Sequence, residues 1–226
     1  MSEPLILSVE TATLSGSVAI ARGEQLLAVL SGDPKISHSN TLLADVDRLL
    51  GETKISVSDV DLFAVATGPG SFTGLRIGIA TVKALSATLD RPSVGIPTLE
   101  AVALSGGVSE NSVALLPAGR GEVFTQLFSV SGANSVKTLD EPAHVPPARL
   151  FERYGHLESV TWCGEGAAVH RELIESSAAG KEWRIAPPDP NLATHVARLA
   201  FKRRQFDDPY TLRAIYVRPA DAQLKT

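Results

Sequence analysis

The sequence contains a single cysteine, Cys163, among 226 residues, and this scarcity excludes two kinds of architecture. One thiol cannot form an internal disulfide framework, and it cannot build a thiolate zinc site, which needs several cysteine ligands. A lone thiol is typical of a reducing compartment. Because Cys163 ends a predicted strand next to Trp162, we interpret it as a small buried residue.

Long apolar runs and an excess of positive charge are also missing. The apolar run near the N-terminus, Leu5–Leu7, is far shorter than a signal-peptide core or a membrane span, so we expect a cytoplasmic protein with no membrane partner. A net charge of −4 and a pI near 5.7 argue against a strongly basic nucleic-acid binder. The basic run 202–204 is interpreted as the solvated face of a helix. Direct tRNA binding by the helix over 198–204 is therefore the weakest functional hypothesis.

Apolar residues make up 44% of the chain, which is enough to bury a substantial core. Their periodicity predicts the order strand, strand, strand, helix, strand, helix in the first half, and a less regular repeat of it in the second. The two halves show no obvious sequence identity. We therefore predict an α/β chain of two mixed lobes, residues 1–106 and 107–226, with a late helix over 191–205 and a C-terminal tail in the second lobe.

Two helices of the first lobe are distinctive. The first begins at His38, and its leucines and valine fall on one helical face. The second, over 73–89, is apolar or small nearly all round, which predicts burial on several sides in a core or a subunit interface. The face of the first helix comprises Leu42, Leu43, Val46, Leu49 and Leu50, and the small residues of the second are Gly74, Gly78, Ala80 and Ala84.

A glycine-rich stretch, VATGPGSFTGLRIG over 65–78, connects a predicted buried strand to the second helix. Backbone N–H groups at such a helix start can hold an anion. The glycine spacing does not match the dinucleotide fingerprint, and no Gly-Lys-Ser/Thr follows as a phosphate loop requires. The pattern alone leaves a structural turn and a phosphate site as alternatives.

The string GPGSFTGLRIG resembles the signature of the TsaB family, formerly called YeaZ. SVETATLSGSVAI is similar to that family's opening strand and turn, HSNTLL to its first-helix start, GIPTLEAVA to the end of its first lobe and CGEGA to its late glycine turn. The resemblance covers nearly the whole chain. It implies the two-lobed fold shared by actin, sugar kinases and heat-shock ATPases, in a reduced form.

The resemblance also implies a non-catalytic role in tRNA modification. In this family a related subunit, TsaD, transfers the threonylcarbamoyl group to N6 of the adenosine beside the anticodon, and the ATPase TsaE joins the complex. We expect tRNA to be reached only through that complex. By analogy the two helices would contact TsaD or a second copy of the chain, through His38, Leu42, Asp45, Leu49, Phe72, Thr73, Arg76, Ile77, Gly78, Thr81 and Ala84.

The turn Glu10–Gly16 corresponds, in the resemblance, to the first phosphate-contacting turn of the larger fold. Its hydroxyl and N–H groups suit phosphate oxygens. The second lobe offers CGEGA as a candidate remnant of the matching site, although Glu165 is interpreted as a polar turn residue. We expect no resident cofactor, with ATP reaching the chain only at a composite site in the complex. The vestigial turn comprises Glu10, Thr11, Thr13, Ser15 and Gly16.

The rival hypothesis is an enzyme, either a weak ATPase or a glycoprotease-like metallopeptidase. The TsaD partner carries two helical histidines four residues apart, whereas Leu42 stands four residues after His38, and Asp45 and Asp47 project at other angles. We therefore expect no metal site. A serine hydrolase lacks support because no Gly-x-Ser-x-Gly elbow occurs.

One loop departs from the family pattern. Relatives commonly carry an aspartate and a pair of basic residues before the segment Glu-Val-aromatic, whereas this chain has PAGRGEVF over 117–124. Arg120 and Glu122 survive, but the aspartate does not. This departure weakens a nucleotide-hydrolysing role further.

Overall fold

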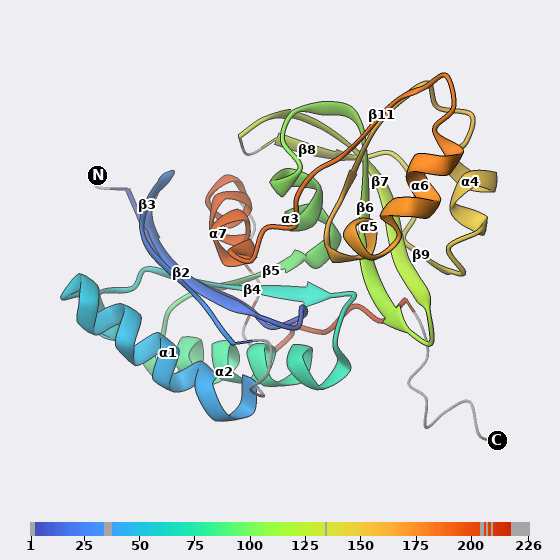
Figure 1. Cartoon of the computed structure of the whole chain (residues 1–226). Helices are drawn as coiled ribbons and strands as arrows, with labels where there is room; N and C mark the ends of the chain where they lie inside the picture. Colours follow the sequence, from blue (N-terminus) through green and yellow to red (C-terminus); the bar gives the residue numbers. More distant parts are fainter. Residues whose placement is uncertain are drawn as a thin grey trace. The chain divides into compact units, whose positions relative to one another are not determined.

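The computed structural model describes residues 3–33, 38–133, 135–203, 206, 208 and 210–217, with the side chains of 38–40 excepted (Figure 1). The chain forms two compact units. The first comprises Met1–Ala101 and Pro190–Ile215, and the second comprises Val102–Asp189 and Tyr216–Thr226. Each unit is built on its own mixed β-sheet.

The first unit contains a five-stranded sheet in the order β3-β2-β1-β4-β5. The first three strands form an antiparallel meander, because short polar turns at 11–16 and 23–24 reverse the chain, while β4 and β5 run parallel to β1. The strands are β1 (Leu5–Glu10), β2 (Ser17–Arg22), β3 (Gln25–Ser31), β4 (Leu62–Gly68) and β5 (Ser93–Pro97).

Helices cover both faces of this sheet. In Figure 1, α1 (His38–Thr53) and α2 (Phe72–Leu89) lie side by side on one face, and α7 (Leu192–Lys202) lies on the other. Alternation along β1 explains this, since Leu7 and its odd-numbered neighbours join the core with α1 and α2, whereas Ser8 points the other way and donates to the Ala193 carbonyl of α7 at 2.7 Å. Both faces of β1 are therefore buried.

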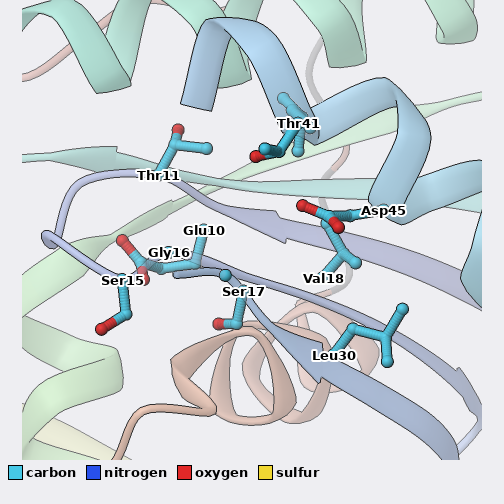
Figure 2. A pocket seen from close by; sticks show the side chains of 11 residues that line it. Glu10, Thr11, Ser15, Gly16, Ser17, Val18, Leu30, Thr41 and Asp45 are labelled. Atoms are coloured by element: carbon cyan, nitrogen blue, oxygen red, sulfur yellow. The ribbon is translucent and has the colours of Figure 1, made fainter. Parts of the chain in front are cut away.

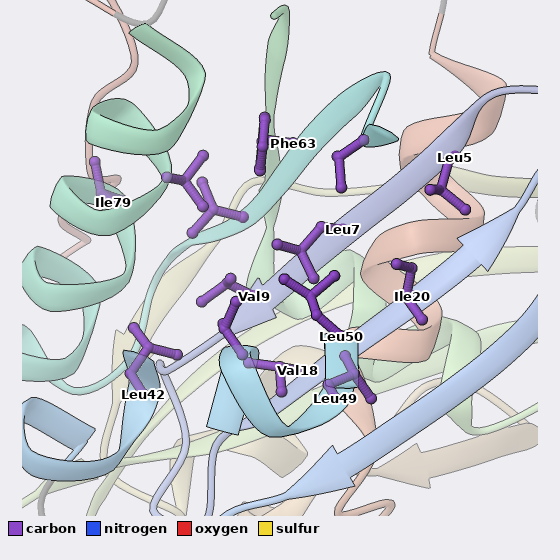
Figure 3. Packing of buried hydrophobic residues seen from close by; sticks show 14 of the residues in the cluster. Leu5, Leu7, Val9, Val18, Ile20, Leu42, Leu49, Leu50, Phe63 and Ile79 are labelled. Atoms are coloured by element: carbon purple, nitrogen blue, oxygen red, sulfur yellow. The ribbon is translucent and has the colours of Figure 1, made fainter. Parts of the chain in front are cut away.

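The core between the sheet and the helices α1 and α2 contains aliphatic side chains and one phenylalanine (Figure 3). Most of the predicted apolar face of α1 is buried there, including the fully buried Leu49. The prediction was wrong for Leu43, which is 65% exposed. Leu43 lies about 100° around the helix from Leu42, at the edge of the apolar stripe and close to the start of the helix.

The structure excludes one of the two alternatives predicted for α2, burial on several sides within a core. Its inner side, which includes Leu75, Ile79 and Val82, packs on the sheet, but its outer side is exposed. Small residues such as Ala80 and Ala84 therefore lie on the surface of this chain rather than in its core.

The second unit contains a six-stranded sheet in which β11-β10-β6-β7-β8 are neighbours and β9 pairs with β7. With β9 left out, the order of the strands in this sheet repeats that of the first unit. The very short strands β9 and β11 were not predicted, because they are too short for a clear alternation pattern. The strands are β6 (Ser109–Gly119), β7 (Glu122–Gly132), β8 (Ser135–Thr138), β9 (Ala143–Val145), β10 (Ser159–Cys163) and β11 (Glu182–Ile185).

Three short helices, α4 (Arg149–Tyr154), α5 (Glu165–Val169) and α6 (Arg171–Ser177), complete the second unit. Their buried side chains pack around Trp162, which is fully buried in the core of the unit. The break between α5 and α6 falls at His170.

The division between the units differs from the sequence-based boundary at residue 106. It falls after Ala101, inside helix α3 (Thr98–Ser105), and α7 belongs to the first unit. The reason is the apolar side of α7, which is buried, and the backbone of Ala193, whose N–H donates to Ser17 Oγ at 2.9 Å. The predicted tail lies largely outside the described residues. Among those described, no helix is long and apolar enough to cross a membrane.

Two leucines of α1 provide a test of this core. We expect Leu49→Ala to lower the free energy of unfolding by about 2–5 kcal/mol, because it leaves a cavity among fixed neighbours. The matched change Leu43→Ala, at an exposed position of the same helix, should cost less than about 0.5 kcal/mol. Urea denaturation followed by circular dichroism measures both. Equal losses would contradict the assignment of the buried face.

Candidate functional site

The turn after β1 is closed from within by a buried carboxylate. Glu10 Oε1 accepts hydrogen bonds from the backbone N–H of Ala12 at 2.5 Å and of Thr13 at 2.9 Å. Its Oε2 accepts from the Thr13 hydroxyl at 2.8 Å. Glu10 has no exposed surface. Two N–H groups of the predicted phosphate turn are therefore bonded to a side chain of the same turn.

A small cavity lies between this turn and α1 (Figure 2). Its volume of about 10 Å³ is close to the minimum that one water molecule needs. Thr11, Thr41 and Asp45 line it together with the end of the turn. A phosphate group does not fit in this space. Of the predicted turn residues, Glu10, Thr11, Ser15 and Gly16 line the cavity, while Thr13 bonds to Glu10.

The same turn is fastened to the start of α2. The Thr11 hydroxyl donates to the Gly74 carbonyl at 2.8 Å, and the Ser71 N–H donates to the Ala12 carbonyl at 2.8 Å. Ser71 also caps α2, because its hydroxyl accepts from the Gly74 N–H at 3.2 Å. Three hydrogen bonds therefore set where the helix begins.

Two glycines of the signature are explained by this contact. A Cβ atom at Gly74 would lie 1.9 Å from the Thr11 carbonyl oxygen, and one at Gly78 would lie 2.3 Å from Thr11 Oγ1. Neither glycine has a positive φ. Close helix packing on the turn, rather than a special backbone conformation, therefore requires them. Sequence reasoning did not predict this pairing, although the spacing of four residues between the glycines was visible.

The outer surface of α1 and α2 carries several of the predicted interface residues. Phe72 is 37% exposed, and the Arg76 guanidinium carbon lies 3.8 Å from the centre of its ring. Thr73 and Ala84 are also exposed. Leu43, which the predicted set omitted, is the most exposed leucine of α1.

The other predicted interface residues are buried or half-buried, or their side chains are not described. Leu42, Leu49 and Gly78 are buried within the first unit, so they support the two helices rather than line their outer surface. Asp45, Ile77 and Thr81 are half-buried. The side chain of His38 lies outside the described residues.

In the second unit, the candidate remnant around Glu165 packs tightly on a neighbouring strand. A Cβ atom at Gly164 would lie 2.3 Å from the Leu115 carbonyl oxygen, and one at Gly166 would lie 2.9 Å from the Leu115 Cβ. These glycines therefore have a packing role. Cys163 is fully buried, its thiol donates to the Val113 carbonyl at 3.4 Å, and burial raises its pKa to about 12.

The structure locates most of the basic residues considered for tRNA binding and of the residues considered for metal binding. Lys202 pairs with Glu24 at 2.7 Å and Arg203 with Glu100 at 2.8 Å, so both cations are engaged by carboxylates. Arg204 lies outside the described residues. Within the described part of the chain, no three His, Cys, Asp or Glu side chains gather as metal ligands.

Comparison with known proteins places the chain in a family. The family model described as "TsaD: tRNA N6-adenosine threonylcarbamoyltransferase" matches residues 34–205. The tRNA threonylcarbamoyladenosine biosynthesis protein TsaB of Haemophilus influenzae is 31% identical over 233 residues, which cover 96% of this chain and 95% of that protein. The chain belongs to the TsaB branch of this family. TsaB of Bacillus subtilis is 27% identical over 224 residues, covering 97% of this chain and 96% of the relative.

Solved structures confirm the predicted fold class. YeaZ is the older name of TsaB. The structure of YeaZ from Pseudomonas aeruginosa superposes on this chain with a TM-score of 0.76 at 24% identity, and the match covers 94% of this chain and 99% of the YeaZ chain. Component A of the (R)-2-hydroxyglutaryl-CoA dehydratase of Acidaminococcus fermentans has a TM-score of 0.51 at 10% identity, with 88% and 97% of the two chains covered. The chain therefore has the actin-like ATPase fold in a reduced form.

A double-mutant cycle tests the contact between the turn and α2. We expect Gly78→Ala to lower the free energy of unfolding by about 1–3 kcal/mol, because its Cβ displaces the Thr11 hydroxyl. In a Thr11→Ala background the same change should cost at least about 1 kcal/mol less. Gly51→Ala on α1, where an added Cβ meets nothing within 4 Å, is the control and should be neutral or stabilising by up to about 1 kcal/mol. Additive losses in the cycle would refute the contact.

The buried thiol predicts slow alkylation. At pH 8 a pKa near 12 leaves about one thiolate in ten thousand, so Cys163 should react with iodoacetamide at least about 1,000-fold more slowly than a free cysteine. The same residue in urea-unfolded protein is the control and should react at the ordinary rate. Rapid stoichiometric labelling of the native chain would show that the thiol is accessible.

Proposed function

We propose that this TsaB protein is a non-catalytic subunit of the machinery that makes threonylcarbamoyladenosine in tRNA, and that it binds TsaD through the outer surface of α1 and α2. The family supports the process, because full-length relatives are named for threonylcarbamoyladenosine biosynthesis. The exposed outer surface of α2 is the observation that supports a role as a binding partner. On this proposal tRNA and the ATPase TsaE are reached through the complex.

The composition of that surface suits a protein contact. Leu43 and Phe72 expose large apolar side chains, and aromatic and arginine residues such as Phe72 and Arg76 are enriched in interfaces. The side chains of Ala80 and Ala84 are single methyl groups. They let the axis of a partner helix approach to the 8–10 Å that is usual for packed helices. A second copy of the chain would use the same surface, so homodimer formation and TsaD binding should exclude each other.

The assignment as non-catalytic is supported by the turn after β1. Its N–H groups at Ala12 and Thr13 are bonded to Glu10, and the neighbouring cavity has room for about one water molecule. We therefore propose that the isolated chain holds no nucleotide, and that ATP acts at a composite site in the complex. Purified alone, it should neither hydrolyse ATP nor modify tRNA.

A charge on the exposed side of α2 tests the interface. We expect Ala84→Glu to weaken association with TsaD at least about 100-fold, because the new carboxylate would be buried without a partner. Ser176→Glu, at an exposed position on α6, is the matched control and should bind normally. Light scattering of each variant mixed with TsaD from the same organism measures the complex, against 23.8 kDa for the free chain.

The outcome shows whether the outer surface of α2 is part of the interface with TsaD. A one-to-one complex formed by the unchanged chain and by Ser176→Glu, but not by Ala84→Glu, supports the proposal. Normal binding by a folded Ala84→Glu variant would remove α2 from the interface. Failure of the unchanged chain to bind TsaD, or ATP hydrolysis by the chain alone, would contradict the partner role itself.

A further inference from the structure

The turn after β1 has the geometry of an anion-binding turn whose ligand comes from the chain itself. Successive N–H groups that converge on one point form a concave anion site. Here the N–H groups of Ala12 and Thr13 converge on Glu10 Oε1, and the Thr13 hydroxyl donates to Oε2. We propose that Glu10 permanently fills this anion site, and that the filled turn positions α2 instead of binding a nucleotide phosphate.

Burial makes the carboxylate a strong determinant of the turn. A carboxylate removed from water is stable only when hydrogen-bond donors surround it, and the fully buried Glu10 accepts from the N–H groups of Ala12 and Thr13 and from the Thr13 hydroxyl. A phosphate at the N–H groups of Ala12 and Thr13 would have to displace this carboxylate. The native turn therefore has no open position for a phosphate.

The opposite side of the turn transmits this constraint to α2. The Ala12 carbonyl and the Thr13 N–H belong to one planar trans peptide, so holding this N–H toward Glu10 directs the carbonyl the other way, at Ser71, whose N–H donates to it at 2.8 Å. The Thr11 hydroxyl meets the Gly74 carbonyl one turn later. Glu10 is thus a positioning residue for the helix that starts at Phe72, although it lies on a different element.

Three variants separate the roles of charge and shape. Glu10→Ala removes the carboxylate and one methylene, the atoms of an acetate ion, and should lower the thermal midpoint by about 5 °C or more, because buried donors lose their acceptor. Glu10→Gln keeps an oxygen for the two N–H groups but removes the charge, so it should lose less than half as much and still more than an exposed control. Glu110→Ala, an exposed carboxylate in the second unit, is the control and should change little.

Chemical rescue then identifies the empty site. Replacing sodium chloride with sodium acetate at equal ionic strength should raise the midpoint of Glu10→Ala by several degrees more than that of the unchanged chain or Glu110→Ala. Equal shifts in all three proteins would overturn the assignment of an anion site. If Glu10→Ala does not fold, the comparison of Glu10→Gln with Glu110→Ala still decides, since a loss no larger than that of the control excludes a structural carboxylate.

The unchanged chain provides the phosphate test. Titration with inorganic phosphate should leave the amide resonances of Ala12 and Thr13 unmoved in NMR spectra of the native protein. Saturable shifts of these two resonances would show that phosphate competes with Glu10, and would refute the proposal.

The consequence for α2 rests on the proposed partner role, and its test is separate. Glu10→Gln should bind TsaD about 3-fold to 10-fold more weakly than the unchanged chain, and hydrogen exchange of amides 74–79 should be faster in the free variant. If amides 74–79 exchange at the same rate in Glu10→Gln and in the unchanged chain, the positioning role is refuted, whether or not the variant binds TsaD. Faster exchange without any TsaD binding by the unchanged chain would instead count against the proposed function alone.

Discussion

The contact between the turn after β1 and the start of α2 is the constraint on which the first unit depends. The turn holds its own carboxylate on one side and the helix on the other, through Ser71, Gly74 and Gly78. Because the helix start is fixed in this way, the inner side of α2 packs on the sheet, and its outer side is left as a surface of small residues. A residue larger than glycine at 74 or 78 would disturb both sides at once.

This arrangement gives the glycine-rich signature a structural meaning. A glycine-rich turn before a helix is often a phosphate site, because its N–H groups are unpaired. Here Gly74 and Gly78 let the turn of β1 approach the helix, and the anion in the first turn is Glu10. On the proposed account, the position that a phosphate could take in this turn is filled from within by Glu10.

The sequence predicted much of the fold, because the chain has clear periodicity and a specific motif. The strands of the first unit, the helix from His38 and the fold class follow from these patterns. Exposure of Leu43 and of the outer side of α2 did not follow, since a helical stripe has no sharp edge and small residues suit a core and a surface equally. The contact of Thr11 with Gly78 joins residues far apart in the chain, and no local pattern encodes it. The placement of α7 in the first unit likewise depends on tertiary packing.

Hydrogen exchange of the chain with and without TsaD tests the central claim most directly, because it reports every amide at once. The account predicts slower exchange on binding in α1 and along α2, with no change in the strands of the second unit. Slowing confined to the second unit at saturating TsaD, with α1 and α2 exchanging as in the free chain, would contradict it.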